Sequence, residues 1–411
     1  MIQSATTSKL QIYKAEAQEE LVRMLDFWMK HALDEKNGGF VGKMDRHLSI
    51  DKKAPKGSVL HARILWTFSA AFRHTNNPAY LEIAHRAYTY LLKRFYDTEY
   101  GGIYWAVDTK GKPLHTRKQS YALAFAIYGL SEYYRATAKP EALQTCQVLF
   151  YWLEKYSFDP AFGGYFDALS REGELLEDLR LSEKDRNDPK TLNTHLPMLE
   201  AYANLYRIWP DKQVAQQLEA LLETFLHHIV DTHTGHMQLF FTADWTATTR
   251  LVSHGHDIET SWVLQQAAEV LGNEELIEKT KATAVAMARI TAKAIQPDGS
   301  LYHTYDEETG LSDTHRVWWV SAEAMVGFMN AYQLTEEEHF LDNSWDAWQF
   351  AKKYLLDKEK GEWLWGVDNT YTVIETEDKI SFWKSPHPSA RMCIEIVNRC
   401  QRVLAEAQYR S

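Results

Sequence analysis

The sequence has few cysteines, no excess of basic residues and no long apolar run. Its three cysteines, Cys146, Cys393 and Cys400, are odd in number and form no Cys-x-x-Cys pair, which predicts reduced, packed thiols. The net charge of -11 disfavours nucleic acid and anionic membranes as partners. No apolar stretch approaches membrane-spanning length, and the first residues lack the apolar region of a signal peptide. These absences predict a soluble, cytoplasmic protein.

Aromatic residues, in contrast, are abundant. The chain of 411 residues is 45% hydrophobic and 13% aromatic, with 14 Trp and 22 Tyr. It can therefore bury a large core, and its length permits two or three domains or one large repetitive domain. Aromatic faces suit sugar rings, although they also fill cores.

A repeat of six units organises the chain. Glycine turns followed by aromatic or aliphatic residues recur, with Gly39, Gly102, Gly164, Gly235, Gly299 and Gly361 as markers at spacings of 63, 62, 71, 64 and 62 residues. Each glycine predicts a turn, and the short run after it predicts a hairpin strand. Each interval has room for two helices, as the apolar periodicity indicates.

Twelve helices are predicted, in six pairs. Their ranges are 9-35, 58-74, 78-96, 118-137, 139-156, 193-209, 212-230, 256-272, 274-295, 317-334, 337-356 and 387-407. Because no polar capping unit stands at either end, we expect the units to close into one all-α (α/α)6 barrel domain over residues 1-411, with short β-hairpins in the connecting loops. An open helical array is the alternative fold.

Chemically unusual residues collect where the second kind of helix begins. They are His61 and Arg63; Arg117, Lys118 and Tyr121; Asp185, Asn193 and His195; His254, His256 and Glu259; Trp318, Trp319 and Glu323; and Trp383, Lys384, His387 and Arg391. In a closed barrel these helix starts would surround one mouth and direct six positive dipole ends there, which suits an oxyanion. Taken singly, each residue is more often structural, and the recurrence is what favours a site.

The densest stretch is Ser253-His254-Gly255-His256-Asp257-Ile258-Glu259. His256 and Glu259 are three residues apart, so both lie on one face of a first helical turn. Imidazole moves protons near neutral pH, and a carboxylate can orient it or bind a hydroxyl. A metal site at His254, His256 and Glu259 is disfavoured because the two histidines point apart on a helix, so no metal is expected.

Six stretches together resemble the N-acylglucosamine 2-epimerase superfamily, in particular its cellobiose 2-epimerase and mannose 2-epimerase branch. They are His61 to Phe68, Arg117 to Ala122, Asn193 to Leu196, Gly255 to Glu259, Trp318-Trp319 with Ala322 to Ala324, and Phe382 to Lys384 with Arg391 to Cys393. The resemblance runs from about residue 15 to the end. It implies an (α/α)6 barrel and cofactor-free epimerisation at C2 of glucose or mannose, free or at the reducing end of a β-1,4-linked disaccharide.

The resemblance also implies roles for individual residues. His256 would be an acid/base with Glu259 beside it, and Arg63 would hold the C1 and C2 oxygens as negative charge develops. Tyr121, Asp185 and Asn193 would bind hydroxyls, and Trp319 and Trp383 would pack on sugar faces. His195, His254 and Glu323 complete the predicted substrate-binding set. A base removes the C2 proton to give an enediolate, and a proton returned to the other face inverts C2.

Two positions depart from the family pattern. Pro197 stands where relatives usually have the second histidine of Asn-Thr-His-x-His, and Pro388 stands where they usually have the histidine of Tyr-His. His387 lies one residue before that second position, so it is the candidate for the partner base. Proline tolerates the first turn of a helix, so we expect both helices still to begin here.

Three other readings remain open. An aldose-ketose isomerase would return the proton to C1 of the same enediolate. A glycoside hydrolase would use paired carboxylates, for which Asp185, Glu259 and Glu323 are candidates. A low-activity or non-catalytic sugar-binding descendant would fit the two prolines. The sequence does not indicate an oligomeric state.

Overall fold

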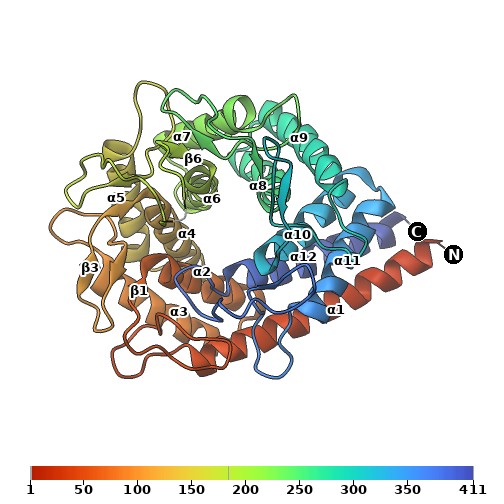
Figure 1. The fold of residues 1–411 in the computed structure, drawn as a ribbon, viewed down its shortest axis with the longest axis horizontal. Helices are drawn as coiled ribbons and strands as arrows, with labels where there is room; N and C mark the ends of the chain where they lie inside the picture. Colours follow the sequence, from red (N-terminus) through yellow and green to blue (C-terminus); the bar gives the residue numbers. More distant parts are fainter. Residues whose placement is uncertain (1, 184, 411) are drawn as a thin grey trace.

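Two concentric rings of helices make up the computed structural model, which describes residues 2–183 and 185–410 (Figure 1). The inner helices are α2 (Ser58–Thr75), α4 (Ser120–Thr137), α6 (Leu192–Ile208), α8 (His254–Leu271), α10 (Trp318–Thr335) and α12 (His387–Arg410). The outer helices are α1 (Ile2–His31), α3 (Pro78–Tyr90), α5 (Pro140–Tyr156), α7 (Lys212–Thr224), α9 (Glu274–Ala292) and α11 (Glu338–Tyr354). Single wide turns, η1 (Leu91–Phe95) and η2 (Phe225–Ile229), extend α3 and α7.

The inner ring is closed. Each inner helix packs against the next, and α12 packs against α2, so the last unit meets the first. Among the outer helices, α1 packs on α12, and α11 packs on α10 (Figure 1). This closure confirms the (α/α)6 barrel and disagrees with the open array.

Local sequence signals set the helix boundaries. Asn77 caps α3 by accepting a hydrogen bond from the Ala79 N–H at 3.1 Å, and Pro78 is the first residue of that helix. Gly272 ends α8 with a left-handed φ of 77°. The predicted ranges agree with the structure to within a few residues, except that α1 begins at Ile2 rather than at residue 9.

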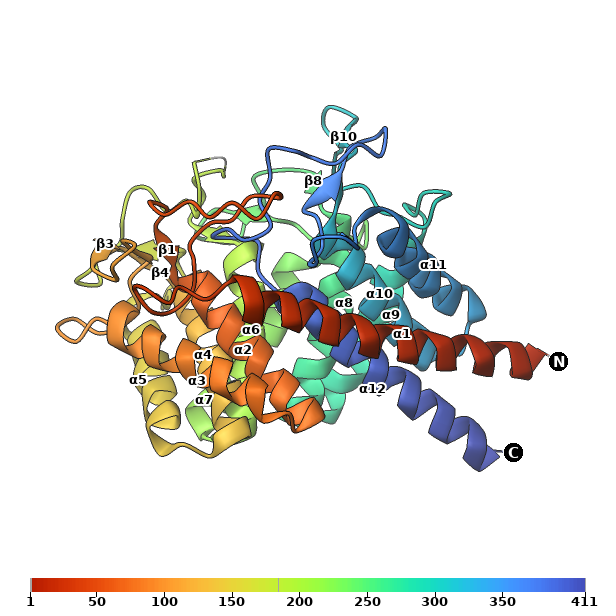
Figure 2. The same ribbon diagram turned by 90° about the horizontal axis from the view of Figure 1, so that it is seen from below.

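Short antiparallel strands connect the units at one end of the ring (Figure 2). They are β1 (Lys56–Gly57), β2 (Ala106–Val107), β3 (Pro113–His115), β4 (Lys118–Gln119), β5 (Ala168–Leu169), β6 (Lys190–Thr191), β7 (Phe240–Phe241), β8 (Leu251–Val252), β9 (Thr304–Asp306), β10 (Leu311–Asp313), β11 (Arg316–Val317) and β12 (Gly366–Val367). The sheet orders are β1-β2-β3, β4-β5, β6-β7, β10-β9-β8 and β11-β12. A strand directly before an inner helix thus pairs with a strand of the following unit.

The marker glycines have a steric reason. Gly39 has φ of 64°, and a Cβ atom there would lie 2.7 Å from the Tyr90 ring. Gly164 has φ of 75°, and a Cβ atom there would lie 2.8 Å from His195 Nε2. Both turns therefore need the left-handed backbone and the missing side chain of glycine.

A buried cation stands two residues before several inner helices. Lys56, Lys118 and Lys190 pair with Asp34, Asp97 and Asp159 at 2.7, 2.9 and 2.7 Å. Each of these carboxylates also accepts N–H groups of the neighbouring turn. These lysines therefore connect one unit to its Gly turn, and Lys118 is structural.

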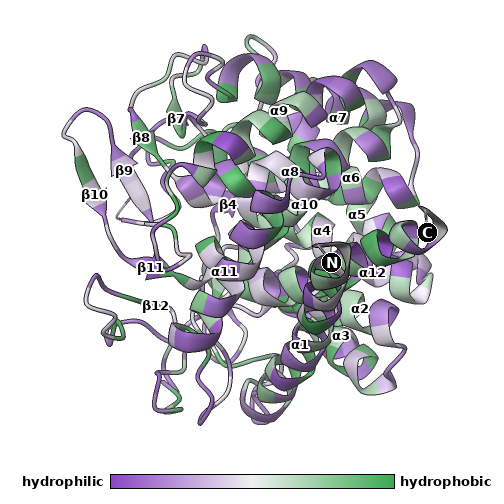
Figure 3. Ribbon diagram, turned by 90° about the vertical axis from the view of Figure 1, so that its right-hand side faces the viewer, coloured by the Kyte–Doolittle hydropathy of each residue, from purple (hydrophilic) through white to green (hydrophobic). Residues whose placement is uncertain are grey.

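The core lies between the two rings of helices, and hydrophobic stretches (green) alternate with hydrophilic ones along the helices in Figure 3. Cys146, Cys393 and Cys400 are buried there as free thiols, as predicted. Among the described residues, no helix is long and apolar enough to cross a membrane.

The space inside the ring is lined in layers. The sixth residues of the inner helices are Arg63, Phe125, Pro197, Glu259, Glu323 and Arg391, where α12 is counted from Pro386 because its carbonyl accepts the Ala390 N–H at 2.9 Å. The ninth residues include Trp66, Tyr128, Glu200 and Trp262, and the sixteenth include Arg73, Arg135 and Arg207. Steps of three and four residues keep these side chains on one helix face, so the residues named here are directed toward the interior together.

Candidate active site

A cavity of about 180 Å³ lies inside the ring at the N-terminal ends of the inner helices. We call it the upper cavity. Its lining residues are Arg63, Tyr121, Phe125, Asn193, Leu196, Pro197, Glu200, His256, Glu259, Trp318, Trp319, Glu323, Trp365, Trp383, His387, Pro388 and Arg391. Nine of the twelve predicted site residues are among them, and the three that are not are Asp185, His195 and His254. Residues from all six inner helices therefore meet in one place.

His256 is held by the cap of its own helix. Ser253 is the N-cap of α8, and its Oγ lies 2.9 Å from His256 Nδ1. Within residues 2–183 and 185–410, His256 Nε2 makes no hydrogen bond, so that nitrogen is left for a ligand. The Trp319 ring lies 4.8 Å from the imidazole, centroid to centroid. Burial lowers the pKa of His256, which favours a neutral imidazole able to accept a proton.

Arg63, on α2, is held in place by two hydrogen bonds. One Nη donates to the Tyr121 hydroxyl at 2.6 Å and the other to the Trp383 carbonyl at 3.2 Å. The guanidinium carbon lies 4.3 Å from the centre of the Phe125 ring, and its buried Nε has no partner. These contacts present a rigid, positively charged group to the cavity.

The aromatic wall comes from distant parts of the chain. Trp383 packs edge-on to Tyr121 at 5.8 Å, and Trp318 packs on Trp365 at 4.4 Å. Flat aromatic faces beside polar groups are suited to a sugar ring, which has apolar C–H faces and hydroxyls at its rim.

Three carboxylates meet on Arg391 at the floor of the upper cavity. One Nη donates to Glu259 at 2.6 Å and to Glu323 at 2.8 Å, and the other pairs with Glu200. Glu323 also accepts the Trp262 indole N–H at 3.1 Å. The four groups come from α6, α8, α10 and α12, so this cluster ties together four of the six inner helices.

Burial perturbs this cluster strongly. Desolvation raises the pKa of both Glu200 and Glu323, although Arg391 opposes that change. Burial alone would lower the pKa of Arg391, but the carboxylates reverse the effect and raise it. One cation cannot neutralise three carboxylates, so the cluster retains protons near neutral pH and offers both donors and acceptors to hydroxyl groups.

His387 is the first residue of α12 and lines the upper cavity. Its ring stands edge-on to Trp66 at 4.7 Å and to Phe125 at 5.7 Å, and its buried Nε2 has no partner among the described residues. Burial lowers the pKa of His387 well below its ordinary value, with Arg391 and Arg63 contributing, so the ring is neutral. Pro388 follows it in the first turn, as expected.

Pro197 does not lie in a first turn, contrary to the sequence-based expectation. Helix α6 begins at Leu192, so Pro197 is its sixth residue and lies inside the helix. Proline has no N–H, and the Asn193 carbonyl therefore lacks its usual helical donor four residues later. Pro197 faces the upper cavity in the layer that holds Arg63 and Glu259.

His195 lies outside the upper cavity because it holds the loop of its own unit. It is fully buried, its Nδ1 lies 2.7 Å from the Thr191 carbonyl, and its Nε2 accepts the Tyr165 N–H at 3.0 Å. His61 makes the equivalent bonds to Gly57 and Phe40, and Asp257 accepts the Met237 N–H at 2.8 Å. All three are the fourth residue of an inner helix. We call this the latch position.

Asp185 and His254 also lie elsewhere. Asp185 accepts the Ser182 hydroxyl at 2.8 Å in the loop before β6. His254 groups with His236 and Asp257, whose possible metal-ligand atoms all lie within 4.8 Å of one another. This group could not be recognised from the sequence, because His236 belongs to the preceding turn. Asp257 Oδ2 lies 2.7 Å from His236 Nδ1 and Oδ1 accepts the Met237 N–H, so a metal would have to displace the contact between His236 and Asp257.

The layers explain which residues sequence reasoning missed. Glu200 joins the cluster and Trp365 completes the aromatic wall, yet neither was singled out from the sequence, and Arg391 was noted at a helix start without a role. Glu200 lies nine residues into its helix, so a search confined to helix starts overlooks it. A search for polar residues at the sixth and ninth positions of each inner helix would have found Glu200 and Arg391.

The chain belongs to the N-acylglucosamine 2-epimerase (GlcNAc 2-epimerase) family, whose model matches residues 38–383. It is similar to a cellobiose 2-epimerase of Bacteroides fragilis, with 44% identity over 388 residues that cover 94% of this chain and 99% of that protein. The solved structure of cellobiose 2-epimerase from Bacillus thermoamylovorans superposes with a TM-score of 0.91 at 38% identity, covering 95% of this chain and 100% of that one. The chain is thus a carbohydrate epimerase, an enzyme of the isomerase class.

A more distant likeness concerns the fold alone. The crystal structure of a D-mannose isomerase has a TM-score of 0.82 to this chain at 18% identity, and 93% of this chain is covered. The barrel is therefore shared with an enzyme of another reaction type, and the residues in the cavity must decide the chemistry.

Proposed function

We propose that the chain, acting as a single catalytic domain, interconverts the glucose and mannose configurations at C2 of a hexose, without a metal or other cofactor. The hexose is either free or the reducing-end unit of a β-1,4-linked disaccharide. The observation that carries the proposal is the meeting of His256, Arg63 and the Arg391 cluster in one aromatic-walled cavity. A cavity of about 180 Å³ is below the 300–1,000 Å³ of typical ligand pockets, which favours a single sugar ring inside it.

In this reaction, His256, Arg63 and the Arg391 cluster each have a different role. In the opened aldose the C1 carbonyl acidifies the C2 proton, and neutral His256 removes it through its free Nε2. Negative charge then develops on the C1 and C2 oxygens, where Arg63 and the positive ends of the inner helices stabilise it. The protonated and ionised carboxyl groups around Arg391 bind the remaining hydroxyls.

Inversion requires a proton on the other face of the enediolate. His387 is our candidate for the group that supplies it, because its Nε2 is unpartnered and it is part of the lining. To deliver the proton, His387 must carry it on Nε2 as an imidazolium, and the step leaves the neutral ring, which can accept the C2 proton in the reverse direction. A proton returned to C1 instead would give the ketose, so the position of His387 relative to C2 decides between epimerase and isomerase.

Deuterium incorporation tests this assignment. Mannose, glucose and cellobiose are each incubated with the protein in heavy water, and NMR follows C1 and C2. The wild type is expected to exchange the C2 proton and to form the C2 epimer, whereas His256→Asn is expected to do neither. His254→Asn is the matched control, since this histidine lies on the same helix outside the cavity, and it should keep full turnover.

The variant His387→Phe separates the two bases. If His256 and His387 serve opposite faces, this variant exchanges the C2 proton of one epimer only and forms almost no product. Full turnover in His387→Phe would assign the second step to another group. Saturable sugar binding with no C2 exchange in the wild type would instead identify a non-catalytic descendant, and deuterium at C1 of fructose would identify an isomerase.

A further inference from the structure

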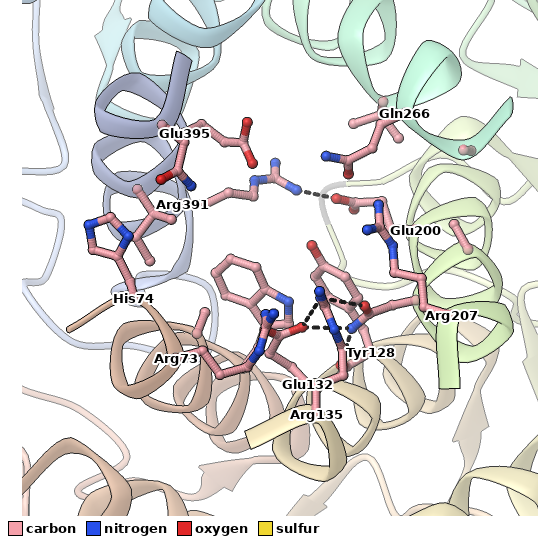
Figure 4. Close-up of a pocket in the computed structure, with 18 of the residues that line it drawn as sticks. Arg73, His74, Tyr128, Glu132, Arg135, Glu200, Arg207, Gln266, Arg391 and Glu395 are labelled. Carbon is pink, nitrogen blue, oxygen red and sulfur yellow. Dashed lines mark hydrogen bonds and ion pairs between the residues drawn. The ribbon is translucent and has the colours of Figure 1, made fainter. Parts of the chain in front are cut away.

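A second cavity, of about 370 Å³, lies inside the ring beyond the Arg391 cluster. We call it the lower cavity. Its lining includes Trp66, Arg73, Glu132, Arg135, Arg207 and Glu395 (Figure 4). Glu200 and Arg391 line both cavities, so their ion pair separates the two. The proposed epimerase reaction uses only the upper cavity and leaves the lower one unexplained.

Three arginines from successive inner helices converge on the lower cavity. Arg73, Arg135 and Arg207 are the sixteenth residues of α2, α4 and α6, and Figure 4 shows all three at its wall. Arg73 and Arg135 each use a single Nη on the same carboxylate, that of Glu132, at 2.5 and 2.8 Å. Arg207 has no hydrogen-bond or ion-pair partner among the described residues. Most of the N–H donors of these three guanidinium groups are therefore unused.

The local charge is positive. Glu132 neutralises one of the three arginines, Glu395 pairs with Arg399 at 3.0 Å, and Glu200 pairs with Arg391. Counted over the whole lining, four arginines and three glutamates leave an excess of one positive charge in a chain whose net charge is -11. Burial lowers the pKa of Arg207, and the nearby charge of Arg135 lowers it further, although Glu132 and Glu395 oppose this change.

A purely structural explanation covers only part of this arrangement. Arginine in the last turn of a helix stabilises the negative end of the helix dipole, and all three residues lie in last turns. That effect does not require three side chains to share one cavity. The buried Trp66 indole N–H also has no partner, and Trp66 lines the same cavity, so a further hydrogen-bond donor is available there.

We propose that the lower cavity binds a small phosphate-bearing molecule, with the phosphoryl group held by Arg73, Arg135 and Arg207. Guanidinium groups match the geometry of phosphate oxygens, and several of them together discriminate a dianion from a neutral sugar. The volume of about 370 Å³ is within the range of ordinary ligand pockets, so it has room for an attached hexose-sized group as well as the phosphate.

Titration calorimetry on the full chain tests the proposal. Inorganic phosphate, glucose 6-phosphate and unphosphorylated glucose are titrated at one pH and one ionic strength, because salt screens such contacts. We expect saturable binding of at least one phosphate compound. Binding of both with equal affinity means that the arginines hold free phosphate, whereas tighter binding of the ester means that the rest of the cavity contributes.

Single substitutions locate the bound anion. Arg207→Gln and Arg73→Gln are expected to weaken binding at least tenfold, a loss of about 1.4 kcal/mol. Arg289→Gln is the matched control: Arg289 is on outer helix α9, pairs with Glu337 and lies away from both cavities, so affinity should not change. Thermal unfolding of each variant confirms that it is folded.

Three results would overturn the proposal. They are no saturable binding of either phosphate compound up to about 10 mM, unchanged affinity in both Arg207→Gln and Arg73→Gln, and loss of binding in Arg63→Gln together with displacement by saturating mannose. The last result would place the anion in the upper cavity. None of these measurements depends on epimerase turnover, so failure of the lower-site proposal and failure of the proposed function can be told apart.

Discussion

The two ends of the same six helices make two different cavities. At their N-terminal ends, tryptophans, His256 and the Arg391 cluster enclose about 180 Å³, and at their C-terminal ends, arginines surround about 370 Å³. The helix dipole is positive at the first end and negative at the second. Carboxylates accumulate near the first end and arginines near the second, so each cavity carries side chains whose charge opposes that of the helix ends around it.

This comparison shows that distance along an inner helix determines what a residue does. Position four of α2, α6 and α8 binds the loop, position six of all six inner helices enters the upper cavity, and position sixteen of α2, α4 and α6 enters the lower one. Residues that are close in sequence, such as His254 and His256, can therefore have unrelated roles, whereas Arg63 and Glu259 share a layer although they are distant in sequence.

The largest expected effect separates the two cavities by function. His256→Asn should lower kcat by about 10²–10⁴-fold, because it removes the group that accepts the C2 proton. Its affinity for phosphate should stay unchanged, and Arg207→Gln should show the opposite pattern. Steady-state kinetics and calorimetry on the same preparations measure both. Equal loss of both activities in either variant would show that the cavities do not act independently.

Arg391 is the residue that both cavities share, so replacing it should damage both. Arg391→Met leaves three carboxylates without their common partner, and we expect a loss of about 3–5 kcal/mol in the free energy of unfolding. Urea denaturation measures this loss. Arg391→Lys keeps the positive charge but lacks the planar set of guanidinium N–H donors, so it should recover part of the lost stability. A methionine variant as stable as the wild type would refute the role of the cluster in joining the helices.

Replacing His195 tests whether this residue stabilises the fold or binds the substrate. His195→Ala leaves the buried Tyr165 N–H without an acceptor, which should cost about 1–3 kcal/mol of stability. KM for the sugar should not change, because the side chain lies outside the upper cavity. Thermal unfolding and steady-state kinetics provide the two numbers. A raised KM in a variant of normal stability would instead return His195 to the substrate-binding set.

Per unit of pH, the smallest effect on stability comes from a titrating group of the upper cavity. Burial raises the pKa of Glu323, so the folded state keeps a proton that the unfolded chain releases near pH 4.3. Stability contributed by this group therefore falls as the pH rises from about 4.3 through the raised pKa, by at most about 1.4 kcal/mol per pH unit. Glu323→Gln should show a shallower decline in urea denaturation between pH 6 and pH 9. An identical slope in both proteins would show that Glu323 is ionised throughout.

The sequence was enough for the architecture because the fold repeats. Six glycine markers and the apolar periodicity predict the helices, and the missing capping units predict closure. The start of α1 was placed too late because its first turns carry polar residues such as Gln3 and Ser4, which lack apolar periodicity. The strands are short, and each pairs over only two or three residues.

The site was predicted less completely, for a physical reason. Proximity to a helix start indicates which mouth a residue is near, but not which direction its side chain takes. His195 and Asn193 are two residues apart, so one is directed toward the loop and the other toward the cavity. The Arg391 cluster is formed by residues that lie at different depths on four helices. No single stretch of sequence contains them together.

Closure of the inner ring by α12 and α2 also affects how the chain matures. Helix α2 is made early, yet the neighbour that completes its packing is made last, more than 300 residues later. At about 5–20 residues per second, synthesis of that interval takes roughly 15–65 s. During that time the flank of α2 that will meet α12 is uncovered, so a nascent chain stalled before residue 387 should be a substrate for chaperones and prone to aggregate.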